Sequence, residues 1–262
     1  MPGTERMSTM GRIAFAAIFA AGFFVQPGLA ATPEVGDTVT VSNEVIAEAG
    51  DIKRMLAKGA KVFQDEVLVT GNSASAEIEL LDKTKLAVGS SARIVLDKFI
   101  YDASAAPGSI SINLAKGAFR FITGSSPKAA YQIKTPTASM GVRGTVFDVY
   151  VADDGETAVL LHEGGVDVCP TPATCKRHDK IGHIVHVGLD QSISEPQRWD
   201  GKIMKGVRVT QAFPFVGKKL NIDPTMRSTY ASLMRGPNRV TAGICRVGGA
   251  LKKPRLPFGP AN

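Results

Sequence analysis

Hydrophobic and polar residues alternate along much of the chain between residues 60 and 189. In the run 131–135, Tyr131 and Ile133 fall on one side of an extended chain, and the polar residues between them fall on the other. The run 146–151 has the same period of two, which is typical of strands with one buried face. The other strands that the pattern predicts are 38–41, 61–69, 74–81, 85–88, 93–101, 108–114, 118–123, 157–162 and 166–168.

Tight-turn signals such as Gly71-Asn72, Pro107-Gly108 and Asp153-Asp154-Gly155 separate these runs. Strands this short, joined by turns, indicate an all-β domain, because βαβ units need longer helical crossovers. The spacing of the strands is not constant, so a regular repeat array is not supported. Residues 51–58 are expected to form either a short helix that Gly59 ends or a loop.

The most informative stretch runs from Ala130 to Cys169. Pro136 has no N–H and biases the residue before it to an extended conformation, so it suits the end of a strand. Gly141 and Gly144 flank Val142-Arg143, where a positive φ or a close backbone approach is expected.

This stretch resembles the FecR domain of bacterial periplasmic proteins. Upstream runs at 65–71, 76–82, 86–89 and 114–119 fit the same family pattern, and the resemblance covers roughly residues 40–189. It implies a twisted, solenoid-like arrangement of short antiparallel strands, which patterning alone does not distinguish from a sandwich. The motif and structural residues are Thr135, Pro136, Gly141, Val142, Arg143, Gly144, Thr145, Phe147, Glu163, Gly164 and Val166.

Arg143 is the charge of most interest, since its guanidinium can donate up to five hydrogen bonds. A structural Arg143 would bond neighbouring carbonyls or a carboxylate, and Arg143→Ala would then unfold the domain. The alternative is an anchor for an anion or a partner. Asp82 and Asp148 are expected to bond turn or strand backbone, and His162 is expected to be structural.

The first 30 residues have the features of a cleaved signal peptide. Arg6 and Arg12 precede an apolar run at 13–25, and Gly28-Leu29-Ala30 places small residues where a signal peptidase cleaves. An uncleaved anchor is the weaker alternative, because a spanning helix needs about 20 apolar residues. We therefore expect a signal peptide at 1–30, a FecR-type β domain at 31–199 with its core at about 60–189, and an extension at 200–262. No later stretch is long and apolar enough to span a membrane, so we expect no transmembrane segment in the mature chain. The resemblance implies the periplasm of a Gram-negative bacterium as its location.

Charge is distributed unevenly between the domain and the extension. Residues 31–199 contain 17 Lys and Arg against 21 Asp and Glu, whereas residues 200–262 contain 12 basic residues and two acids. Such a basic extension either contacts an unknown envelope protein or an anionic envelope component, or is a solvated tail. Nucleic acid is not an expected partner of an exported chain. The extension should be mostly irregular, partly disordered, with one short helix at 225–235 after Asp223-Pro224.

Two cysteines, Cys169 and Cys175, bracket a turn-rich segment and are expected to form a disulfide in an oxidising compartment, while Cys245 has no obvious partner. His178, His183 and His186 follow this pair and raise the alternative of a zinc site. The Cys spacing does not fit zinc, and two of the histidines fall on opposite faces of a strand. We expect no metal and no other cofactor.

The sequence contains no nucleophile elbow, P-loop, zinc-protease helix or dinucleotide fingerprint. An exported, non-enzymatic FecR-domain protein that binds or supports an envelope component is therefore the main hypothesis. The alternative is a cell-surface signalling component related to FecR-type regulators of iron and siderophore response, without their cytoplasmic anti-sigma segment. An enzyme is the third and least favoured class.

Overall fold

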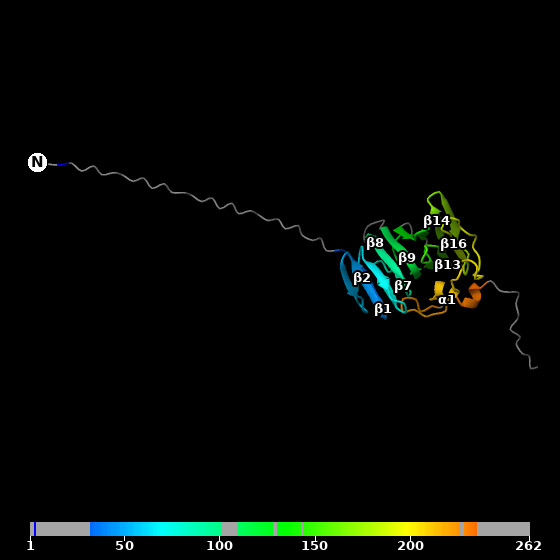
Figure 1. The fold of residues 1–262 in the computed structure, drawn as a ribbon, viewed down its shortest axis with the longest axis horizontal. Coiled ribbons are helices and arrows are strands. Elements are labelled where there is room, and N and C mark those ends of the chain that lie inside the picture. The colour runs from blue at the N-terminus through cyan, green and yellow to red at the C-terminus, as the bar shows by residue number, and fades with distance from the viewer. Residues whose placement is uncertain are drawn as a thin grey trace, which may run out of the picture. The chain divides into compact units, whose positions relative to one another are not determined.

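A computed structural model describes Gly3 and residues 32–100, 109–127, 130–142, 144–225 and 228–234. The regular structure of the described part consists of strands and of two one-turn helices near its C-terminal end, joined by turns and irregular connections (Figure 1). This confirms the predicted all-β class. Among the described residues, no helix is long and apolar enough to cross a membrane.

The strands form two sheets that share one long strand, β9. The first sheet has the order β4-β1-β6-β7-β9-β12-β13-β16, and the second has the order β3-β2-β5-β8-β9-β10-β11-β14-β15. All described pairs are antiparallel except that between β9 and β10. The strands are β1 (Glu34–Ser42), β2 (Val45–Ala49), β3 (Ile52–Met55), β4 (Lys61–Phe63), β5 (Val67–Thr70), β6 (Ser75–Leu80), β7 (Lys85–Val88), β8 (Arg93–Ile100), β9 (Ser109–Ile122), β10 (Tyr131–Lys134), β11 (Ser139–Val142), β12 (Val146–Val151), β13 (Thr157–Glu163), β14 (Val166–Thr171), β15 (Thr174–His178) and β16 (Ile184–Val187).

Strand β9 passes from one sheet to the other near Gly117. Its first part pairs with β8 and β10, and its second part pairs with β7 and β12. Gly117 has φ 101°, and a side chain there would overlap Ala92. A residue without a Cβ is therefore required where the strand changes sheet. The sequence pattern predicted two strands here, at 108–114 and 118–123, because the polar Lys116 and the glycine interrupt the alternation.

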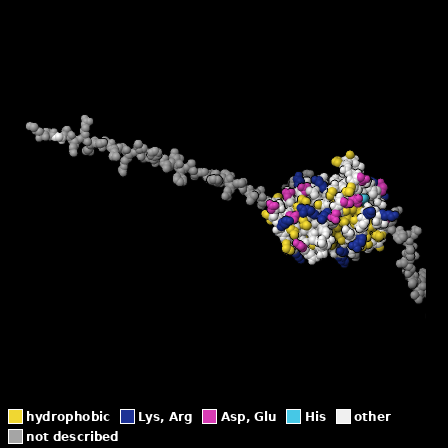
Figure 2. Space-filling model, in the orientation of Figure 1, with side chains coloured by type: hydrophobic (Ala, Val, Ile, Leu, Met, Phe, Trp, Pro, Cys, Tyr) yellow, Lys and Arg dark blue, Asp and Glu magenta, His cyan; other side chains and the backbone are white. Residues whose placement is uncertain are grey.

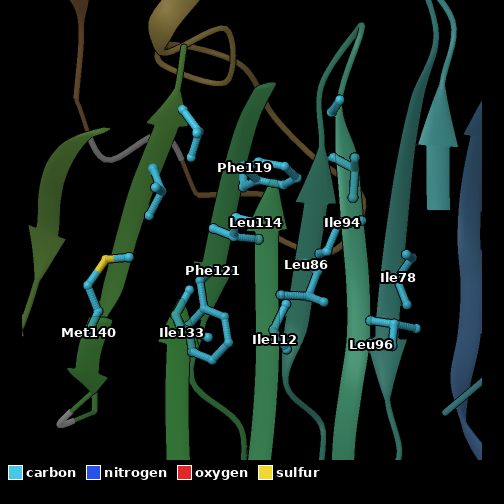
Figure 3. Close-up of a cluster of buried hydrophobic side chains, with 14 of the residues drawn as sticks. Ile78, Leu86, Ile94, Leu96, Ile112, Leu114, Phe119, Phe121, Ile133 and Met140 are labelled. Carbon is cyan, nitrogen blue, oxygen red and sulfur yellow. The ribbon is translucent and has the colours of Figure 1, made fainter. Parts of the chain in front are cut away.

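The main core lies between the two sheets. It contains alternate residues of the shared strand and its neighbours, and Figure 3 shows such side chains meeting between the strands. The Phe121 ring lies 5.4 Å from the tilted ring of Phe147, and it meets the Tyr131 ring edge-on at 5.7 Å. The residues labelled in Figure 3 are Ile78, Leu86, Ile94, Leu96, Ile112, Leu114, Phe119, Phe121, Ile133 and Met140.

A second apolar cluster covers the outer face of the first sheet. Outward-facing residues of β12 and β13, such as Tyr150 and Leu160, pack there against residues from the C-terminal segment. We call this segment, residues 200–234, the strap. It contains helices α1 (Val209–Ala212) and α2 (Tyr230–Leu233). The side chains that seal the cluster are Trp199, Met204, Ala212, Phe213, Phe215, Val216, Ile222 and Leu233, all buried.

Several local predictions were wrong. Residues 51–58 contain strand β3 and no helix, because Ile52–Met55 extends the β2 hairpin. Within the range 225–235, the described residues contain one helix, α2, whose N-cap is Thr229. Asp223 and Pro224, which were expected to start the helix, do not cap it. The prediction of a solvated tail is wrong for residues 200–225 and 228–234, because apolar residues of these ranges pack on the first sheet. Residues 235–262, including Cys245, and the predicted signal peptide lie outside the described residues.

Candidate functional site

The motif residues lie at the ends of strands β10 to β13. Thr135 follows β10, and its hydroxyl accepts hydrogen bonds from the Ala138 N–H at 3.0 Å and from the Thr157 hydroxyl at 2.9 Å. Thr137 bonds the same Thr157 hydroxyl at 2.8 Å. The exposed Pro136 lies between these two threonines. This end of the motif thus joins the β10–β11 turn to the start of β13 through hydroxyl groups.

The rest of the described motif also serves packing. Val142 and Phe147 are buried in the main core, and the Thr145 N–H donates to the Thr123 hydroxyl at 2.8 Å. Gly164 has φ 77°, and a side chain there would overlap the Gly144 carbonyl oxygen. These residues therefore hold strands together, and their side chains do not form a catalytic pair.

Of the remaining motif residues, Val166 is buried in the main core. Gly141 in β11 is exposed and has free space beside it, and Gly144 has φ 69°, which fits the positive φ expected of one of the two glycines. Glu163 at the end of β13 is exposed. Arg143 lies outside the described residues.

Cys169 and Cys175 form a disulfide, as predicted, across the β14–β15 hairpin. His178 in β15 is buried, and its Nε2 lies 3.0 Å from the His183 carbonyl oxygen. His186 Nε2 lies 3.2 Å from a Glu156 carboxylate oxygen. Within the described ranges, no group of three or more His, Cys, Asp or Glu side chains is placed to hold a metal ion.

A buried charged network lies on the outer face of the first sheet, beneath the strap. Arg120 of β9 and Asp148 of β12 are directly opposite each other and form a two-bond ion pair with N–O distances of 2.6 and 2.9 Å. His162 of β13 lies 3.1 Å from Asp148 through Nε2. From the strap, the Asp223 carboxylate lies 3.9 Å from Arg120, and the Phe215 ring lies 5.9 Å from its guanidinium carbon.

Charge pairing keeps Asp148 and Arg120 ionised although both are buried. Burial alone would raise the pKa of Asp148, but its neighbours His162 and Arg120 hold the pKa below the ordinary value. Burial acts to lower the pKa of Arg120, and the Asp148 carboxylate outweighs it and raises the pKa. A buried pair of this kind is costly to break, because the remaining charge is left without a partner. This pair joins β9 to β12, and Asp223 connects the strap to it.

The network also contains a hydroxyl, a histidine and a carboxylate in series. The Ser228 hydroxyl lies 3.1 Å from His162 Nδ1, and His162 Nε2 lies 3.1 Å from Asp148. This order is similar to a nucleophile, base and acid, but Arg120 already holds both oxygens of Asp148, and the His162 side chain has no exposed surface. A substrate cannot reach the base without displacing the strap, so the series serves to bind the strap.

We call the two packed sheets, residues 34–187, the sandwich. The exposed cations of the strap differ from those of the sandwich. Most Lys and Arg side chains of the sheets pair with a carboxylate, as Lys53 does with Glu48 at 2.9 Å and Lys61 does with Glu34 at 2.7 Å. In the part of the strap that the structure describes, the exposed Lys and Arg side chains have no carboxylate partner. Figure 2 shows Lys and Arg side chains along the margin where the strap runs in Figure 1. The lysines are Lys202, Lys205, Lys218 and Lys219.

The position of two charged residues in apolar strands is a sequence signal for the charged network. Arg120 sits between Phe119 and Phe121, so it faces away from the core, and Asp148 stands likewise between apolar residues. Charged residues in the middle of apolar strands must be paired when they are covered. Their partners in the strap could not be found this way, because its anchors have no regular period.

Comparison with known proteins gives one family match. Residues 66–167 match the family described as FecR protein, which confirms a FecR domain over β5 to β14, within narrower bounds than 40–189. No curated protein matches the sequence. Two crystal structures of a candidate anti-sigma factor from Parabacteroides distasonis ATCC 8503 are similar, with 15% identity and a TM-score of 0.40. The similarity covers 50% of this chain and 59% of that one.

Proposed function

We propose that the protein is an exported, non-enzymatic FecR-domain module that binds in the cell envelope of a Gram-negative bacterium, with the strap as its contact to an anionic surface. The observation that carries this proposal is the difference in ion pairing between the sandwich and the strap. Lys202, Lys205, Lys218 and Lys219 are exposed without carboxylate partners in the described part of the chain, while most sandwich cations are paired.

A cation that already pairs with a neighbouring carboxylate contributes little to attraction at a distance, because the two charges cancel. Unpaired lysines on one segment attract an anionic lipid surface by about 1 kcal/mol each, and salt screens this attraction. Four such residues on a rigidly packed strap are enough for reversible, salt-sensitive binding. The buried network and the aromatic anchors hold these lysines in place.

Two observations support export. The N-terminal sequence has the charge, apolar run and small residues of a signal peptide. The Cys169–Cys175 disulfide fits an oxidising compartment, because thiols stay reduced in the cytosol. We expect the intact mass of protein extracted from the periplasm to begin at Ala31. Recovery with residues 1–30 still attached would contradict cleavage.

The decisive experiment measures binding to vesicles of phosphatidylglycerol and phosphatidylcholine. The variant Lys202→Gln/Lys205→Gln/Lys218→Gln/Lys219→Gln should lose most of its binding at low salt. The matched control Lys53→Gln/Lys61→Gln/Lys83→Gln/Lys134→Gln removes the same number of charges from paired sites and should bind like the wild type. Equal vesicle binding by all three proteins would overturn the role of the strap. An equal loss of binding in both variants would show that the net charge of the protein, and not the position of the strap lysines, determines binding.

A second candidate function is signalling through a protein partner. The FecR match over residues 66–167 favours it, since that domain accounts for most of the sandwich. The two functions separate by experiment: a signalling partner should be captured by the lysine-substituted variant as well as by the wild type, whereas an anionic surface should not.

A further inference from the structure

The strap and the sandwich enclose a cleft of about 390 Å³ between α1, the β7–β8 turn, the bend of β9 at Gly117 and the end of β12. Ser90, Tyr150 and Asp153 line it from the sandwich, and Arg208, Thr210 and Gln211 line it from the strap. A cleft of this volume matches the lower range of small-molecule sites. It does not involve the four lysines of the proposed envelope contact.

The walls of the cleft are held in place by buried groups. Gln211 Nε2 donates a hydrogen bond to the Tyr150 hydroxyl at 3.2 Å, which joins α1 to β12 directly. The Tyr150 side chain is 7% exposed, and burial raises the pKa of its hydroxyl, so the group stays a neutral phenol. Ala212 and Phe213 directly behind the lining are fully buried. The cleft is therefore formed before any ligand enters.

The polar groups that line the cleft include hydrogen-bond donors and acceptors, and one of them, Arg208, is a cation. Arg208 is exposed and has no carboxylate partner in the described ranges, and the same ranges contain no hydrogen-bond partner for the Ser90 or Thr210 hydroxyl. The Asp153 side chain is 94% exposed and lies 3.8 Å from Lys116, so its oxygens can still accept hydrogen bonds. Pro214 and Ala118 add small apolar surfaces.

A ligand that fits these groups carries several hydroxyls, a weakly apolar face and one carboxylate. A guanidinium binds a carboxylate through two parallel hydrogen bonds. Serine, threonine and glutamine side chains pair with hydroxyls, and Asp153 accepts from a hydroxyl donor. We infer that this cleft is a binding site for an acidic sugar unit, such as a uronic acid residue of an envelope or extracellular glycan.

The test compares two sugars that differ in one group. Galacturonate has a carboxylate where galactose has a hydroxymethyl group, so their difference reports the contact to Arg208. Each sugar is titrated into the full-length protein, and its binding is measured by calorimetry and by saturation-transfer NMR. We expect galacturonate to bind, and galactose to bind with roughly tenfold lower affinity. Arg208→Gln should abolish that difference, and Thr210→Val should weaken both sugars.

Controls separate this site from the envelope contact. Lys202→Gln removes a strap charge outside the cleft and should leave galacturonate binding unchanged, as should the four-lysine variant. Arg208→Gln in turn should retain most vesicle binding. Equal affinity for galacturonate and galactose in the wild type, or no binding of either, would overturn the inference. Binding of free glutamate as tight as that of galacturonate would also overturn it, because a carboxylate alone would then be sufficient.

Discussion

Strands β12 and β13 are buried on both faces, but different kinds of structure cover the two faces. The inner face meets the second sheet, and alternate residues such as Phe147 and Val149 fill the main core. The outer face meets the strap, which has two one-turn helices and long irregular connections. There the cover consists of large side chains such as Trp199 and Phe213, which pack edge-on at 5.9 Å, together with the buried charged network.

The difference between the inner and the outer interface of β12 and β13 indicates the role of each interface. The inner interface is regular and almost wholly apolar, as expected of an interface that only stabilises the fold. The outer interface combines apolar anchors with polar contacts from the strap to the buried network, made by Asp223 to Arg120 and by Ser228 to His162. It also carries the unpaired lysines and one wall of the cleft. Both contacts that we propose, the lysines and the cleft, therefore involve the strap, and the sandwich supports it.

Removal of the strap should have the largest effect. Truncation after Trp199 would expose the outer apolar cluster and leave Arg120 and Asp148 facing solvent, with an expected loss of roughly 5 kcal/mol in the free energy of unfolding. Thermal and urea unfolding measure this loss. Truncation after Met234 keeps the described strap and serves as the control. A strap-free protein that unfolds at the same temperature as this control would show that the strap is not part of the fold.

Breaking the charged network should have the next largest effect. Asp148→Leu leaves the Arg120 guanidinium buried without its main partner, and we expect a loss of about 3–5 kcal/mol in the free energy of unfolding. The double variant Arg120→Met/Asp148→Leu removes both charges and should recover most of that loss. If the double variant is as unstable as the single one, packing and not charge pairing holds this region together.

The sequence predicted the inner interface far better than the outer one. Alternation marked most strands of the sandwich, because each has one face in the main core, and the FecR motif identified the domain. Trp199, Phe213, Phe215 and Ile222 have no common period, so nothing local marks them as one surface. Their burial depends on long-range contacts such as the bond from the Tyr230 hydroxyl to the Phe213 carbonyl at 2.8 Å. A high density of Lys and Arg in the same segment favoured the wrong interpretation of a solvated tail.

We expect the free energy of unfolding to depend on pH through His178, which lies in the sandwich and not in the strap. It is buried in β15, and burial lowers its pKa from 6.5 to about 4. In the unfolded chain the His178 imidazole therefore takes up a proton below pH 6.5, whereas in the folded protein it is protonated only below about pH 4. The associated stability is complete above pH 6.5 and is lost as the pH falls through this window, by up to about 3 kcal/mol.

Urea unfolding at a series of pH values measures this effect. His178→Gln should flatten the fall in stability between pH 6.5 and pH 4. His186→Gln is the matched control, because His186 is only partly buried and pairs with Glu156. An unchanged slope in the His178 variant would mean that another group is responsible for the acid sensitivity.

The disulfide should have the smallest of these effects and none on binding. Cys169→Ser/Cys175→Ser opens a loop with a sequence separation of six residues, and the loss of this constraint should cost about 2 kcal/mol in the free energy of unfolding. The β14–β15 hairpin lies at the edge of the second sheet, whereas the strap covers the first. Binding to vesicles and to galacturonate should therefore be retained at temperatures well below unfolding. A variant that stays folded but loses either kind of binding would show that the two faces of the sandwich are coupled.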